Sequence, residues 1–240
     1  MDYRILTATY MLSNLVDGFR EVTIKLQQLR QKITVPNADG RQVALFGMQT
    51  VLLGFGLTVH AITGAGLRTR HRDVDEVNET FLNYATVDGK TQDELMTLTE
   101  SVWRHSLLTL FHFQLDALFQ NLLRAFGSEP GTTGFGNNSK DVLTRVTLVD
   151  RHRAENTLAA ITYVRNSLHN NGIHRGPNWG PFHALGLTYE FQKDDAVKCA
   201  SVGHVLAILD ATVDILEDVL LSSEVTALPK VEDRYVVLNP

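Results

Sequence analysis

The sequence is poor in cysteine and lacks the motifs of several large enzyme classes. Its 240 residues include one cysteine, Cys199. One cysteine excludes an intramolecular disulfide and a cysteine-based zinc site, which fits a reducing compartment. A P-loop, a dinucleotide fingerprint, a kinase signature and a nucleophile elbow are all missing. The first residues do not combine a basic segment, an apolar core and a cleavage site, so we expect no signal peptide and a cytoplasmic location.

The chain also lacks a strong overall charge. Its formal net charge is −5, with 44% hydrophobic and 20% charged residues, which is typical of a globular protein. Binding to nucleic acid would therefore need a local basic patch. Six Lys or Arg and three acidic residues lie between residues 140 and 176, which makes this the basic part of the chain. Ordinary solvated helix faces explain such a region equally well.

A third absence concerns charge within one segment. Residues 42–67 contain no Asp, Glu, Lys or Arg over 26 positions, a length that would suffice for a membrane span. Five glycines and several polar residues favour a buried strand pair or a small-residue helix instead, so we expect no membrane association. The turn signal 36–40 precedes this segment, and short strands between 32 and 62 compete with a simple loop between helices.

Apolar residues at helical spacing dominate the remainder, so we predict a mainly α fold. A strand-like alternation at 185–191, a turn at 193–195 and residues 196–199 predict a β-hairpin insertion near 185–199. We divide the chain into an N-terminal elaboration (1–90), a helical domain (91–222) and a C-terminal tail (223–240), whose residues 235–238 could dock as a strand. The predicted helices are 5–33, 75–85, 91–126 with a Thr91/Glu94 capping box, 139–149, 152–170 and 201–220.

The strongest candidate for chemistry is the segment 163–174, Tyr-Val-Arg-Asn-Ser-Leu-His-Asn-Asn-Gly-Ile-His. Arg165 and His169 lie one helical turn apart, at the edge of the buried face. Gly172 is the expected C-terminal cap, which places His169 in the last turn, where the helix dipole favours its protonated form. Two neighbouring cations favour an anionic ligand such as phosphate.

The dipeptide Arg165-Asn166, followed by a histidine near the end of a helix, resembles the signature of the HEPN superfamily. That family includes metal-independent ribonucleases of toxin–antitoxin and antiviral defence systems, and its signature has four to six residues between the arginine and the histidine. Here three residues separate Arg165 from His169. The resemblance covers this helix and, loosely, the helical pattern of residues 91–220. It implies a HEPN-like helical bundle.

The resemblance also implies roles for individual residues. Arg165 would stabilise charge on the scissile phosphate, His169 would transfer protons around the attack of the 2′-hydroxyl, and Asn166 would orient one of them. Two protomers would pool two copies of His169 in a homodimer, without metal or cofactor. The residues expected to bind the RNA substrate are Asn170, His174, Arg175, Arg151 and Arg153.

Other interpretations stay open. Arg165 could pair with an acid such as Asp116, and His169 could cap its own helix. The protein would then be a non-catalytic HEPN-like module for dimerisation or for binding RNA or a nucleotide, and the apolar helix 107–126 could hold a partner protein. His105 and His112 lie two turns apart on that helix, but no Glu-x-x-His spacing accompanies them, so we expect no metal site and interpret them as satisfied or exposed.

Overall fold

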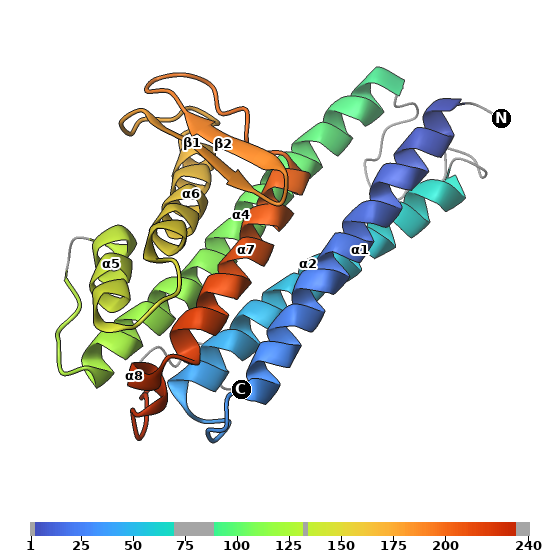
Figure 1. Ribbon diagram of the computed structural model, residues 1–240. Coiled ribbons are helices and arrows are strands. Elements are labelled where there is room, and N and C mark those ends of the chain that lie inside the picture. Colours follow the sequence, from blue (N-terminus) through green and yellow to red (C-terminus); the bar gives the residue numbers. More distant parts are fainter. Residues whose placement is uncertain (1–2, 70–88, 132–133, 234–240) are drawn as a thin grey trace.

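The computed structural model describes residues 3–69, 89–131 and 134–233, with the side chains of 16–58, 101–131 and 134–233. This part of the chain forms seven helices and one two-stranded antiparallel sheet (Figure 1). The predicted mainly α class is therefore confirmed. The elements are α1 (Tyr3–Lys32), α2 (Gly40–Thr69), α4 (Gly89–Ala125), α5 (Phe135–Arg145), α6 (Arg151–His169), β1 (Trp179–Ala184), β2 (Leu187–Phe191), α7 (Val202–Leu220) and α8 (Ser223–Thr226).

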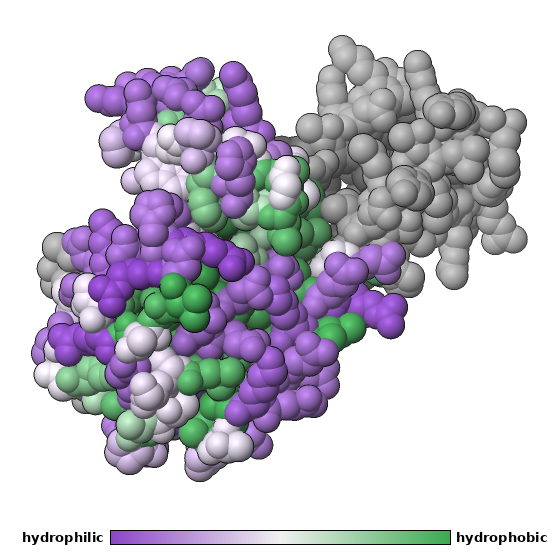
Figure 2. All heavy atoms as spheres, in the orientation of Figure 1, coloured by the Kyte–Doolittle hydropathy of each residue, from purple (hydrophilic) through white to green (hydrophobic). Residues whose placement is uncertain are grey.

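Helices α1, α2, α4 and α7 lie lengthwise against one another, and α5 and α6 pack against α4, with α6 also contacting α7 (Figure 1). The hairpin β1–β2 lies at the end of the bundle where α6 finishes and α7 begins. One apolar cluster runs through all these helices, including Leu26, Leu45, Phe111, Val164 and Leu209. On the face seen in Figure 2, polar side chains surround separate apolar patches. The N-terminal helices thus share their core with the helices that carry the candidate site.

The segment from residue 42 to 67 lies in helix α2, so the short strands considered between residues 32 and 62 were wrong. Its small residues have a packing role. A methyl group at Gly47 would overlap the side chain of Gln114 on α4, so glycine permits a close approach of the two helices. Within the described residues, no helix has a stretch long and apolar enough to cross a membrane.

A buried ion pair holds the turn between α1 and α2. The side chains of Asp39 and Arg41 are 1% and 2% exposed, and Arg41 Nε donates to Asp39 Oδ1 at 2.8 Å. Arg41 also donates to the carbonyl oxygen of Val225, and the backbone N–H of Val231 donates to Asp39. This cluster therefore joins the α1–α2 turn to the segment that follows α7.

Most predicted helices are found with shifted ends. Helix α6 agrees with 152–170 to within one residue at each end, as α7 does at its start. Helix α4 begins at Gly89, two residues before the predicted cap Thr91, and α5 begins at Phe135 instead of residue 139. The predicted helix 75–85 and the tail strand 235–238 lie outside the described residues.

The hairpin is present, but one of its predicted strands was wrong. Residues 187–191 pair with 179–184, and Leu185 and Gly186 form the turn, both at positive φ. Residues 196–199 form no strand; Ala196 makes one isolated bridge to Ile173. The missed strand contains Pro181, which offers no N–H to a ladder, and the pairing is irregular between Trp179 and Phe182.

Candidate functional site

Helix α6 is bounded by local hydrogen bonds that fix where its last side chains point. At its start, Asp150 accepts a hydrogen bond from the backbone N–H of Arg153. At its end, Asn171 and Gly172 adopt positive φ values of 55° and 80°, and the N–H of Gly172 donates to the carbonyl of Ser167. The predicted helix stop at Gly172 is thus confirmed. It leaves His169 as the last helical residue.

His169 is exposed and contacts two side chains of α4. Its Nδ1 lies 2.9 Å from Nε2 of His105, and its Nε2 lies 3.2 Å from the hydroxyl of Thr109. The two imidazole rings meet edge to face, with centroids 4.2 Å apart. His105 and Thr109 are one turn apart on α4, so both nitrogens of His169 are held by one helix face.

The charge state expected for His169 was wrong. Partial burial lowers the pKa of His169, and the nearby Arg165 guanidinium and His105 imidazole lower it further. The helix dipole acts in the opposite direction, toward the protonated ring. A pKa below the usual 6.5 favours the neutral imidazole of His169 at neutral pH. A neutral imidazole beside a guanidinium can accept a proton while the guanidinium stabilises a negative charge.

Arg165 is half-buried between α6 and α4. One terminal nitrogen, Nη1, donates to Oδ1 of the adjacent Asn166 at 2.9 Å, while Nε is buried and meets no acceptor among the described residues. The structure has no ion pair between Arg165 and Asp116, both of which it describes. Oδ1 of Asp116 is itself buried without a hydrogen-bond donor from the described residues.

His112 is a second histidine of α4 near the motif. It is 6% exposed and packs edge-on against Phe135, with ring centroids 4.6 Å apart. Burial lowers the pKa of His112 to about 4, and Arg165 and His169 contribute to the shift. Because its causes include both motif residues, His112 lies within their electrostatic reach.

Sequence reasoning missed the contribution of α4. His105, Thr109, His112 and Asp116 follow the spacing i, i+4, i+7, i+11, which aligns them along one face of a helix. This polar stripe on an otherwise apolar helix was the available signal. We interpreted the two histidines only in terms of metal-binding spacings, and the stripe was therefore missed.

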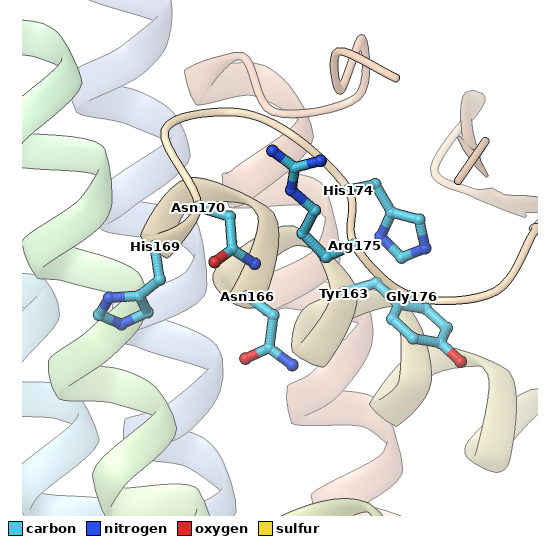
Figure 3. A pocket seen from close by; sticks show the side chains of 7 residues that line it. All are labelled: Tyr163, Asn166, His169, Asn170, His174, Arg175 and Gly176. Atoms are coloured by element: carbon cyan, nitrogen blue, oxygen red, sulfur yellow. The ribbon is translucent and has the colours of Figure 1, made fainter. Parts of the chain in front are cut away.

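A hollow of about 280 Å³ opens beside His169. Figure 3 shows its lining: the α6 side chains point into it from one side, and the following loop closes the other. His169 lies at the edge toward α4. The hollow is lined by Tyr163, Asn166, His169, Asn170, His174, Arg175 and Gly176.

Of the residues predicted to bind substrate, Asn170, His174 and Arg175 reach the hollow. His174 is 2% exposed; its Nδ1 lies 3.3 Å from the Ser167 hydroxyl, and its Nε2 lies 2.8 Å from the carbonyl oxygen of Pro177. Its ring therefore holds the loop in place. Arg175 is exposed and donates to Asp194 at 2.9 Å.

Arg151 and Arg153 are not brought to the hollow. They lie in the first turn of α6, and a rise of 1.5 Å per residue separates Arg151 from His169 by roughly 27 Å. Arg151 donates to the carbonyl of Val146, and Arg153 pairs with Asp214 on α7. The structure gives both arginines local partners far from the motif.

No group of three His, Cys, Asp or Glu side chains suited to a metal ion occurs in the described part of the chain. Comparison with known proteins gives no match: no family model, curated protein or solved structure is significantly similar to this chain.

Proposed function

We propose that this protein is a metal-independent endoribonuclease of HEPN type, which cleaves RNA through attack of a 2′-hydroxyl on the adjacent phosphate. One observation carries the proposal: an exposed imidazole with a lowered pKa, His169, lies at the rim of a polar hollow, held by His105 and within the field of Arg165. A base and a cation at one surface site are what this reaction needs.

In this proposal His169 is the general base. The ribose 2′-hydroxyl replaces the Thr109 hydroxyl at His169 Nε2 and gives its proton to that nitrogen. For Nε2 to accept a proton, the neutral His169 ring must carry its own proton on Nδ1. This Nδ1–H donates a hydrogen bond to Nε2 of His105. His105 is then a positioning residue.

The remaining steps use Arg165 and the same proton. The 2′-oxygen bonds to phosphorus, the bond from phosphorus to the 5′-oxygen breaks, and Arg165 stabilises the charge on the phosphate. The His169 imidazolium returns its proton to the departing 5′-oxygen. The products are a 2′,3′-cyclic phosphate and a 5′-hydroxyl. Since His169 serves as both base and acid in this scheme, the chemistry does not itself require a pair of protomers.

The test is cleavage of a mixed RNA pool by purified protein in EDTA, with analysis of the new ends. The His169→Ala variant should lose cleavage by about 100-fold or more, the usual contribution of a general base. His152→Ala is the matched control, because His152 is an exposed histidine in the first turn of the same helix. Equal rates for wild type and His169→Ala would refute the assignment.

A non-catalytic RNA-binding or dimerisation module is the second candidate. The observation in its favour is that both His169 nitrogens and Nη1 of Arg165 already have partners within the chain. If the protein is such an RNA-binding module, the wild type would bind RNA but yield no cyclic phosphate ends. Binding and end analysis on the same samples therefore separate the two candidates.

The proposal includes a homodimer in the cytoplasm, although one chain can complete the site, and a role in defence or in a toxin–antitoxin pair. Support for the dimer comes from α4 and α2, which expose large apolar side chains. Leu110 and Phe113 on α4 are 45% and 55% exposed, and Phe46 and Leu53 on α2 are also exposed. A second copy or a partner protein would cover this apolar surface.

A further inference from the structure

We infer that the hollow beside His169 binds a nucleobase of single-stranded RNA, with the Asn166 amide donating a hydrogen bond to an acceptor on the base. The inference rests on the proposed function and specifies its substrate. It follows from the orientation of one amide, that of Asn166, and from the side chains around it.

The amide of Asn166 has a fixed orientation. The guanidinium of Arg165 can only donate hydrogen bonds, so the Asn166 atom that it contacts at 2.9 Å is the carbonyl oxygen. The two N–H groups of the amide must then point the other way. Figure 3 shows the Asn166 oxygen on the side of His169 and α4, and its nitrogen on the side of Tyr163. Asn166 thus offers a donor to the hollow.

Asn170 supplies a second amide one turn further along α6. Figure 3 shows its side chain above that of Asn166, facing the same space. The side-chain amide of Asn170 has no hydrogen-bond partner among the residues that the structure describes, so it can donate and accept. Two amides on one helix face can bond to the edge of a planar base, the geometry by which Asn and Gln read bases.

The rest of the lining suits a base within an anionic strand. The ring of Tyr163 is held by His174, Trp179 and Phe191, with centroids 5.2 to 5.5 Å away, so it is a fixed aromatic wall. Unstacked RNA bases commonly pack on such side chains. Arg175 adds positive charge at the rim, and the lining includes no carboxylate.

The position of the hollow gives the base a defined place in the reaction. His169 lines the hollow at its edge, so a bound base brings the ribose of its own nucleotide next to the imidazole. The base in the hollow is therefore the one on the 5′ side of the cleaved bond, whose 2′-hydroxyl attacks.

The test measures binding separately from cleavage. Eight-nucleotide RNAs carry one central base and seven abasic positions, so that charge and length are constant and base stacking is removed. Their affinities for His169→Ala protein are measured by fluorescence anisotropy. We expect a strand with a base to bind at least about fivefold more tightly than the fully abasic strand, as one specific base contact allows.

The key variant is Asn166→Asp in the same His169→Ala background. Aspartate keeps an oxygen for Arg165 but replaces the donor with an acceptor, so the gain in affinity over the abasic strand should fall. Asn156→Asp, which makes the same change nearer the start of α6, should keep this gain. Equal affinity for all five strands, or a gain that survives Asn166→Asp unchanged, would overturn the inference.

Cleavage by the wild type distinguishes failure of the inference from failure of the proposed function. If the wild type cleaves RNA but all five strands bind equally, the nucleobase site is refuted and the nuclease stands. If a base strengthens binding but no RNA is cleaved, the nuclease is refuted and the nucleobase site stands.

Discussion

His105 Nε2 lies 2.9 Å from His169 Nδ1, so two histidines 64 residues apart in sequence form one hydrogen-bonded pair between α4 and α6. The pair brings the end of the motif helix to the polar stripe of α4. It also has an electrostatic consequence, because the His105 imidazole disfavours a positive charge on His169.

The pair predicts how His169 titrates. Burial, Arg165 and His105 lower the pKa of His169 below its usual 6.5. Replacing His105 with alanine removes one imidazole and exposes the other, so the His169 pKa should rise toward its usual value. NMR titration of the His169 ring in wild type and His105→Ala measures both values directly. A wild-type pKa at or above 6.5, or no rise in the variant, would contradict this account of the pair.

His112 predicts a loss of stability in acid. Its pKa is about 4 in the folded protein and about 6.5 when unfolded, so only the unfolded state takes up its proton between these values. Its contribution is complete above about pH 6.5 and falls as the pH drops toward 4, by about 3 kcal/mol in total. Arg165 and His169 on α6, with His105 and Asp116 on its own helix, are the ionisable groups on the seam around it.

Urea unfolding at pH 7 and pH 4.5 tests this prediction, with His112→Gln as the comparison. The variant removes the titrating group, so its free energy of unfolding should fall less over the same interval. If wild type and variant lose equal stability between the two pH values, His112 is not the group responsible.

The ion pair of Asp39 and Arg41 predicts a large effect on stability. Replacing Arg41 with methionine leaves a buried carboxylate without its cation, which typically costs about 3–5 kcal/mol. Lys32→Met is the matched control, since the Lys32–Glu217 pair is largely solvent-exposed and should contribute less than about 1 kcal/mol. Chemical unfolding of both variants at pH 7 checks the difference; similar losses would show that burial of the Asp39–Arg41 pair carries no special weight.

The same ion pair has a pH dependence of known sign. Burial alone would raise the pKa of Asp39, but hydrogen bonds from the Arg41 side chain and from the Val231 and Arg41 backbone N–H groups lower it overall. The stability that this lowered pKa provides is complete above the unfolded value near 3.8 and is lost as the pH falls through the folded one. It therefore acts at lower pH than the His112 effect.

The exposed apolar side chains of α4 indicate the surface at which two protomers would meet in the proposed dimer. A lysine in place of Phe113 puts a charge on that surface, and the dimer dissociation constant should rise by about tenfold or more. Val149→Lys is the control, because Val149 is exposed in the loop before α6, away from this surface. Sedimentation equilibrium measures both, and a wild-type protein that is monomeric at tens of micromolar would contradict the proposed dimer.

Sequence patterns predicted the features that depend on residues close together in the chain, such as helix bounds. The period of apolar residues placed α6 and α7 to within one or two residues, and Gly172 marked the end of α6 because few residues adopt positive φ. The same patterns failed at 42–67, where glycines and a lack of charge fit strands and a small-residue helix alike. Packing of Gly47 against Gln114 is a tertiary contact that no local pattern contains.

The candidate site shows the same limit. Arg165, Asn166 and His169 stand within five residues, so their grouping was visible in the sequence. The pairing of His169 with His105 was not, since it depends on how α4 lies against α6. The charge of His169 was wrong for the same reason: the dipole is local, whereas the effects that lower its pKa include a residue of another helix.

The most direct test of the central claim is the chemistry of RNA ends made by purified protein in EDTA. Wild type and His152→Ala should both produce 2′,3′-cyclic phosphate and 5′-hydroxyl ends, and His169→Ala should produce about 100-fold fewer. Cyclic phosphate ends at the wild-type rate from His169→Ala, or none from the wild type, would contradict it.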